Sequence, residues 1–267
     1  MRLSDGEVHF ELSGPPDGRL CVLVHGITSP AIIWDHTWPA LVGAGMRVLR
    51  LDLYGRGRSD KPKIRYDLEL YVRQLVELLD ALDLTGSVDL VGLSMGGAVV
   101  IGFADRHPNR VRRLALIAPA GVPRRMPLLA RLARVPRVGE IAMRLAGRHI
   151  TAMGVRRSFR RPSASRELIE RVSAQGRDER FLAALLSSIR EMPLTELSDA
   201  YQRVGRLGRP TLLIWGRLDR IAPFAGNAHV LRLIPHTQFI PLPHSGHSCA
   251  YEDPDRVNPV LVAFLRD

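Results

Sequence analysis

Apolar runs alternate with amphipathic stretches along most of the chain, and this alternation predicts the fold class. Nearly continuous runs of Val, Leu and Ile are typical of strands that are buried on both faces of a sheet. Strand-like runs are found at Val8–Leu12, Leu20–His25, Arg47–Leu53, Val88–Gly92, Val111–Ile117, Thr211–Trp215 and Gln238–Pro241, and several of them are nearly continuous. Helical periodicity lies between them, most clearly over Leu68–Leu82. The pattern predicts an α/β protein with a mostly parallel sheet and helices on both faces.

Further helices are expected from the same periodicity. One begins at Met95 or Gly96 and ends before Pro108, and others cover Ala225–Leu233 and Asp255–Leu265. The alternation breaks over residues 121–207, where no convincing strand is found. Helical stretches in that segment are Leu128–Val135, Glu140–Leu145, Ser165–Val172 and Arg180–Arg190. We therefore expect a core formed by residues 1–120 and 208–267, with residues 121–207 as a helical insertion.

The net charge of +11 is concentrated in that insertion. Residues 121–207 hold 18 Arg and 8 Asp or Glu, a net of +10, which leaves the other residues at +1. A solvated, Arg-rich helical surface is the simplest interpretation. No helix-turn-helix, zinc finger or RNA-binding aromatic motif accompanies the charge, so nucleic acid is not expected as a partner. A weak contact with an anionic ligand or a membrane surface through these arginines stays open.

The chain carries no sign of export or of metal binding. Residues 1–19 contain four acidic side chains and no apolar run of signal-peptide length, and no stretch approaches the length of a membrane span. A cytoplasmic location is therefore expected. The two cysteines, Cys21 and Cys249, have no framework spacing, which predicts neither a disulfide scaffold nor a zinc site. Cys21 opens an apolar run and is expected to be a small buried hydrophobe.

The strongest chemical signal is the segment Gly92-Leu93-Ser94-Met95-Gly96-Gly97, which joins a predicted strand to a predicted helix. A serine on such a turn is held in a strained conformation with its hydroxyl at the carboxyl edge of the sheet. The flanking glycines leave room where side chains would clash with the strand and the helix. We predict that Ser94 is a catalytic nucleophile; the alternative is an ordinary Gly-Ser turn.

Two further side chains are expected to complete a catalytic triad. Asp219 follows the apolar run Thr211–Trp215, where a carboxylate can hydrogen-bond a histidine and stabilise its charged form. His247 follows a glycine after the last predicted strand, and we prefer it to His244 as the general base. Each of these residues, taken alone, also fits an ordinary loop or surface role.

Backbone amides near Ser94 are candidates for an oxyanion hole. The N–H groups of Ile27 and Met95 can both reach the space above the serine, because Ile27 follows a strand end and Met95 opens a helix. His25, two residues before Ile27, is expected to brace this loop rather than to transfer protons.

Together these segments resemble the α/β-hydrolase superfamily along essentially the whole chain. The match is carried by His25-Gly26, Asp52–Ser59, Gly92–Gly97, Trp215–Asp219 and Gly246-His247, and by the order Ser94, Asp219, His247. The resemblance implies the α/β-hydrolase fold, with a mostly parallel eight-stranded sheet flanked by helices and a helical cap over the active site. Residues 121–207 occupy the place of that cap.

The resemblance implies a serine hydrolase that cleaves a carboxylic ester, thioester or lactone of a small or acyl-chain substrate, with no metal or organic cofactor. Epoxide hydrolases and haloalkane dehalogenases differ, because they carry Asp where this chain has Ser94. Carbon–carbon bond hydrolases of ring-fission products are similar around Ser94 and Asp219. They commonly have a Gly-rich run where this chain has Ile27-Thr28-Ser29, and Trp where it has Ser248. A catalytically silent binding protein, a lyase and an acyltransferase are the remaining alternatives.

Overall fold

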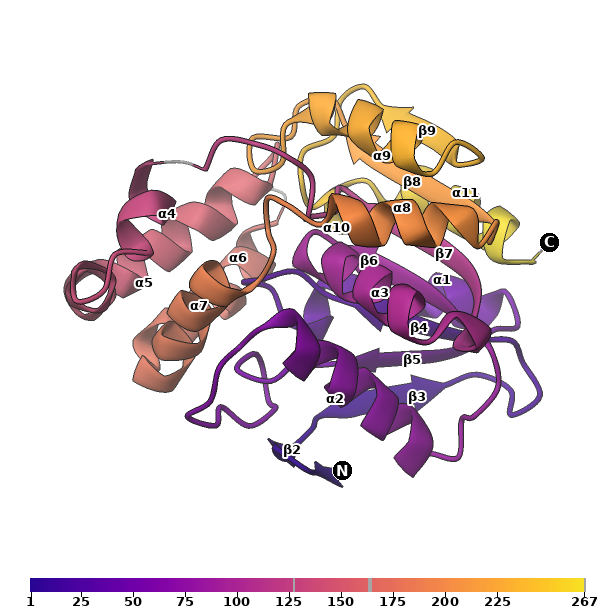
Figure 1. Ribbon diagram of the computed structural model, residues 1–267, viewed down its shortest axis with the longest axis horizontal. Coiled ribbons are helices and arrows are strands. Elements are labelled where there is room, and N and C mark those ends of the chain that lie inside the picture. Colours follow the sequence, from indigo (N-terminus) through magenta and orange to yellow (C-terminus); the bar gives the residue numbers. More distant parts are fainter. Residues whose placement is uncertain (127, 163–164, 267) are drawn as a thin grey trace.

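The computed structural model describes residues 1–126, 128–162 and 165–266, and in them one seven-stranded sheet forms the centre of the molecule (Figure 1). Its spatial order is β3 (Phe10–Ser13), β5 (Arg47–Leu51), β4 (Leu20–Val24), β6 (Val88–Leu93), β7 (Val111–Ile117), β8 (Thr211–Gly216) and β9 (Gln238–Leu242). Only β3 runs antiparallel to its neighbour, β5, and the other pairs are parallel. The predicted mostly parallel α/β sheet is confirmed.

The expected count of eight strands in this sheet is wrong for the described residues. The first two strands, β1 (Arg2–Leu3) and β2 (Gly6–Glu7), pair only with each other as a short antiparallel hairpin. The backbone of Glu7 is already engaged elsewhere: its N–H donates to the Asp60 carboxylate, and its carbonyl accepts the Asp60 N–H. The loop after β5 therefore takes the hydrogen bonds that a further sheet strand would need.

Two apolar clusters cover the two faces of the sheet. Strand β8 shows the alternation, because Leu213 and Trp215 belong to one cluster while Leu212 and Ile214 belong to the other. The first cluster is completed by α2 (Leu68–Ala81), α3 (Met95–Arg106), α8 (Ser198–Arg206) and α9 (Asn227–Leu233). The second is completed by α1 (Trp38–Gly43), α10 (Cys249–Glu252) and α11 (Pro254–Arg266). The core thus lies on both faces of the sheet, and Cys21 is buried in it as predicted.

Four helices form a separate group beside the sheet, which we call the helical lobe (Figure 1). They are α4 (Leu128–Ala133), α5 (Val138–Ser158), α6 (Arg166–Ala174) and α7 (Glu179–Glu191). Helix α8 comes from the same 121–207 segment but packs against α3 and α9 instead. Within the described ranges, no helix is both long and apolar enough to cross a membrane.

Candidate active site

Ser94 lies on a sharp turn between β6 and α3. Its backbone has φ 55° and ψ −117°, in a region that residues with a side chain rarely adopt. Backbone hydrogen bonds hold it there: its N–H donates to the Ile117 carbonyl at 3.0 Å, and its carbonyl accepts the N–H groups of Gly97 at 2.9 Å and Ala120 at 2.8 Å. A strained residue fixed in this way is typical of a functional position.

Glycines around Ser94 allow three backbone segments to approach one another. A Cβ on Gly96 would lie 2.2 Å from the carbonyl oxygen of Val24, and one on Gly92 would lie 2.5 Å from the carbonyl oxygen of Gly96. A Cβ on Gly97 would lie 2.5 Å from the Cβ of Pro119. Side chains at these positions would push the start of α3 away from β4 and β6. The Gly-x-Ser-x-Gly-Gly spacing therefore has a steric cause.

Asp219 and His247 meet at the ends of β8 and β9. The Nδ1 of His247 lies 2.7 Å from Oδ2 of Asp219, and the carboxylate is fully buried. The other carboxylate oxygen accepts the backbone N–H groups of Ile221 at 2.7 Å and Ala222 at 2.8 Å. With both oxygens engaged, the carboxylate orients the imidazole and can stabilise its charged form. His244 is exposed and takes no part in this contact.

A cavity of about 150 Å³ joins the predicted residues. Ser94, His247 and Ile27 all line it, together with Gly154 and Ser158 from α5 of the helical lobe. In the described part of the chain no hydrogen bond joins Ser94 to His247, and such contacts often tighten only when substrate binds. Met95 is buried at the first position of α3, directly after the serine. The arrangement can support attack by a hydroxyl on a carbonyl carbon, with the imidazole as base.

His25 braces the turn that follows β5, as expected. Its Nε2 accepts the N–H of Leu53 at 2.9 Å, so Nδ1 carries the proton and donates to the Gly26 carbonyl at 2.7 Å. Burial lowers the pKa of His25 to about 4, which keeps the ring neutral near pH 7. Both ring nitrogens are occupied by structural bonds, so His25 has no free atom for proton transfer.

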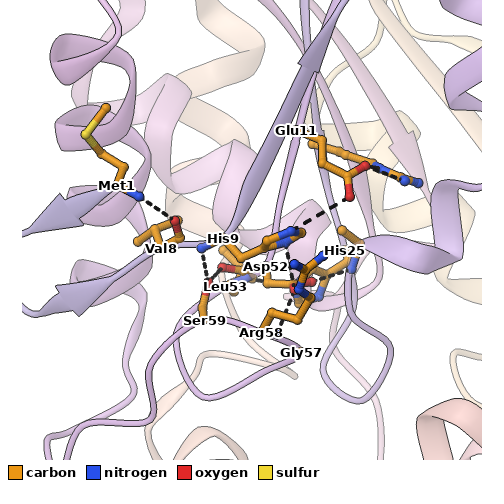
Figure 2. A network of polar contacts seen from close by, with 12 residues as sticks. Met1, Val8, His9, Glu11, His25, Asp52, Leu53, Gly57, Arg58 and Ser59 are labelled. Atoms are coloured by element: carbon orange, nitrogen blue, oxygen red, sulfur yellow. Dashed lines mark hydrogen bonds and ion pairs between the residues drawn. The ribbon is translucent and has the colours of Figure 1, made fainter.

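Asp52 organises the same turn through its carboxylate and its carbonyl (Figure 2). One carboxylate oxygen accepts the N–H of Ala31 at 2.7 Å, and the other accepts the N–H of Arg58 at 2.9 Å and lies 3.3 Å from His9 Nδ1. The Ser59 hydroxyl donates to the Asp52 carbonyl at 2.6 Å. The Asp52–Ser59 motif is therefore a structural brace that holds the loops after β4 and β5 together beside the cavity.

Glu252 has a role at this site that its sequence setting does not predict. Its carboxylate accepts the backbone N–H of Gly246 at 2.5 Å, next to His247, and that of Arg160 at 2.7 Å. Burial raises the pKa of this carboxyl. Glu252 thus ties the loop that carries His247 to the end of α5. Its partners are backbone groups, and Arg160 lies 92 residues away in the sequence, so no residue pattern could reveal them.

Arg56 is a second residue whose role was missed. It is fully buried, and no carboxylate pairs with it among the described residues. Its guanidinium donates to the Ile27 carbonyl at 2.7 Å, to the Ser188 hydroxyl on α7 at 2.8 Å and to the Tyr71 hydroxyl at 3.2 Å. One side chain therefore connects the Ile27 loop to the helical lobe.

A metal site is not apparent in the residues that the structure describes: they contain no group of three or more His, Cys, Asp or Glu side chains arranged to hold an ion. The arginines of the 121–207 segment are exposed for the most part. At the cavity, Ser94 supplies a hydroxyl and His247 an imidazole, and Asp219 supplies the carboxylate that contacts the imidazole.

Comparison with known proteins shows the family of the chain. Residues 21–260 match the model of the alpha/beta hydrolase family. The chain is 34% identical to the dihydrolipoyllysine-residue acetyltransferase component of an acetoin cleaving system from Pseudomonas putida, over 96% of this chain but only 66% of that protein. It is 29% identical to a 2-hydroxy-6-oxononadienedioate/2-hydroxy-6-oxononatrienedioate hydrolase from Paraburkholderia xenovorans, over 99% of this chain and 93% of that one. A thermophilic esterase from Thermogutta terrifontis superposes with a TM-score of 0.82 at 29% identity, covering 97% of this chain and 93% of the esterase.

Proposed function

Because the chain belongs to the alpha/beta hydrolase family, we propose that it is a serine hydrolase of small carboxylic esters, or of the related thioesters and lactones. One observation carries the proposal. The imidazole of His247, fixed by a 2.7 Å contact with Asp219, lines the same cavity as Ser94 on its strained turn. These are the three groups that an acyl-enzyme mechanism requires.

In the proposed mechanism, His247 takes the proton of Ser94 as the hydroxyl oxygen attacks the acyl carbonyl carbon. The negative charge on the carbonyl oxygen is stabilised by the N–H groups of Ile27 and Met95. His247 then protonates the leaving alcohol or thiol. Water, activated by the same imidazole, attacks the acyl-enzyme and releases the acid, while Asp219 stabilises the imidazolium at both stages.

The size of the cavity favours a small acyl group. Its volume of about 150 Å³ is below the roughly 300 Å³ at which pockets for drug-sized ligands begin. Gly154 and Ser158 of α5 line the cavity, so the helical lobe contributes to the wall that limits substrate size. The 29% identical esterase supports ester chemistry in a protein of the same shape.

The test is a panel of esters, thioesters and lactones of increasing acyl length, assayed with the Ser94→Ala variant beside the unmodified protein. We expect turnover of short acyl substrates to fall by at least about a thousandfold in Ser94→Ala, with an unchanged free energy of unfolding. Ser158→Ala, which removes a hydroxyl from the same cavity, is the matched control and should change turnover by less than about tenfold. Near-normal turnover in Ser94→Ala on every substrate would refute the mechanism.

Carbon–carbon bond hydrolysis is the second candidate, and the Paraburkholderia xenovorans hydrolase supports it by its match along nearly the whole chain. A ring-fission dienoate added to the same panel separates the two reactions. A higher kcat/KM for the dienoate than for every ester would replace ester hydrolysis by carbon–carbon cleavage. A silent binding protein predicts instead that a fluorophosphonate probe leaves Ser94 unlabelled.

A further inference from the structure

A basic hollow of about 370 Å³ lies beside the catalytic cavity. Arg156, Arg157 and Arg160 line it from the end of α5 and the segment that follows, and Arg220 lines it from the loop after β8. Apolar side chains, among them Phe159, form the rest of its wall. Four positive charges from two distant parts of the sequence thus surround one space.

These four arginines have no acidic partners within the described ranges. Other arginines of the 121–207 segment do have them: Arg190 pairs with Glu140 at 2.5 Å. The Glu252 carboxylate accepts the backbone N–H groups of Gly246, Arg160 and Arg161 and forms no ion pair with the four side chains. The four residues are exposed and carry the same charge, so an anion that enters the hollow is attracted by all of them.

The hollow adjoins the catalytic cavity along two elements. On α5, Ser158 lines the cavity while its neighbours Arg157 and Phe159 line the hollow. On the loop after β8, Ile221 lines the cavity and Arg220 lines the hollow. The two spaces thus border each other on both elements, so the hollow lies within reach of a substituent on a substrate held at Ser94.

We propose that this hollow, whose four unpaired arginines adjoin the cavity of Ser94, binds a phosphate-bearing substituent of the acyl substrate. Guanidinium groups recognise phosphate through paired, charge-assisted hydrogen bonds, and four of them match a multiply charged phosphate group better than a single carboxylate. The proposal rests on the hydrolase function proposed above. It narrows the substrate class to acyl compounds that carry a phosphate group.

Binding can be measured without turnover by titrating inorganic pyrophosphate into the Ser94→Ala protein in a calorimeter. We expect saturable binding whose Kd weakens about tenfold in an added Arg157→Gln or Arg220→Gln substitution and with rising salt. Arg148→Gln is the matched control, because it removes the same charge from the same helix outside the hollow, and it should change Kd by less than about twofold. Failure to bind pyrophosphate, or equal weakening in the control, would overturn the proposal.

Turnover then tests whether the anion belongs to the substrate. Two thioesters with the same short acyl group are compared, one of a neutral thiol and one of a thiol that carries a phosphate. We expect the phosphate to lower KM about tenfold in the unmodified protein and to have little effect in Arg157→Gln, while kcat/KM for the neutral thioester is the same in both proteins. Equal KM values for the two thioesters would overturn the substrate assignment.

Two outcomes distinguish the anion site from the hydrolase function and from binding of a lipid headgroup. Pyrophosphate binding that persists while no ester or thioester is hydrolysed would refute the hydrolase function and the substrate assignment, yet support the anion site. Sedimentation with vesicles of phosphatidylglycerol, abolished by Arg157→Gln, would replace the substrate by a lipid headgroup as the source of the phosphate.

Discussion

Gly96 in the turn after Ser94 and Gly154 in the helical lobe differ in how closely other atoms approach them. A Cβ on Gly96 would lie 2.2 Å from a backbone oxygen of β4, whereas a Cβ on Gly154 would meet nothing within 4 Å. At the sheet edge, backbone packs directly against backbone and holds Ser94 in place. At Gly154, in the cavity wall, the helical lobe leaves space for a side chain. The contrast teaches that the reacting groups are held in place by the core. The size of the substrate cavity depends instead on a helix that has space for a larger side chain.

The largest effect is expected from a matched pair of substitutions at these two glycines. Gly96→Ala should lower the free energy of unfolding by about 3 kcal/mol, because backbone cannot yield to the new methyl group. Gly154→Ala should raise it by roughly 0.5–1 kcal/mol, because alanine is the better helix former in open space. Urea unfolding of both variants measures the difference, and similar values for the two would break the comparison.

A pH effect of comparable size is expected from His25 on the core side of the cavity. The pKa of His25 is about 4 in the folded protein, below the ordinary value of 6.5, because of burial. Between these pH values the unfolded chain binds a proton that the folded protein does not. The free energy of unfolding is therefore unaffected by His25 above pH 6.5. It falls by about 3 kcal/mol as the pH is lowered from 6.5 towards 4.

The measurement is the free energy of unfolding from pH 7 to pH 4 in the unmodified protein and in His25→Gln. Other titrating groups act in both proteins, so the difference in slope isolates His25. Parallel curves would show that the buried imidazole does not control the acid sensitivity of the sheet edge.

The smallest effect is expected where the core and the lobe are joined. Ser188→Ala removes an acceptor of the buried Arg56 guanidinium and should lower the free energy of unfolding by about 2 kcal/mol. Ser173→Ala on α6 is the control, because that hydroxyl has no hydrogen-bond partner in the described residues, and its loss should cost less than about 0.5 kcal/mol. Thermal or urea unfolding checks both, and equal losses would contradict a specific link through Arg56.

The core could be predicted from the sequence because its strands are nearly continuous apolar runs, and α2 and α3 follow clear patterns. Helix α5 shows why the lobe was harder to predict. It covers Val138–Ser158, although only Glu140–Leu145 had been expected to be helical. Its buried positions recur at helical spacing but are mainly small or polar: Gly139, Met143, Gly147, Thr151, Val155 and Ser158. Apolar periodicity does not reveal a helix face that packs through small residues, as this face of α5 does.

The candidate site also contains residues that could be predicted from the sequence and residues that could not. Ser94, Asp219 and His247 could be proposed because each follows a strand end in a recognisable setting, and the structure brings Asp219 and His247 into contact. Glu252 and Arg56 could not be found, because their partners are mostly backbone groups or side chains from distant segments. The eighth strand was implied by the family resemblance alone, because only seven strand-like runs are found in the sequence. The structure agrees with the residue pattern: the short strand β2 pairs with β1 and stays outside the central sheet.

Helix α5 also connects two environments that lie far apart. Its 21 residues extend for roughly 30 Å. Leu145, in its first half, is 78% exposed to solvent, while Gly154 and Ser158 near its end form part of the wall facing the serine. One continuous helix therefore carries both an exposed apolar position and part of the wall beside the serine. Because the helix is a single rigid element, a displacement of its outer half would also displace the cavity wall.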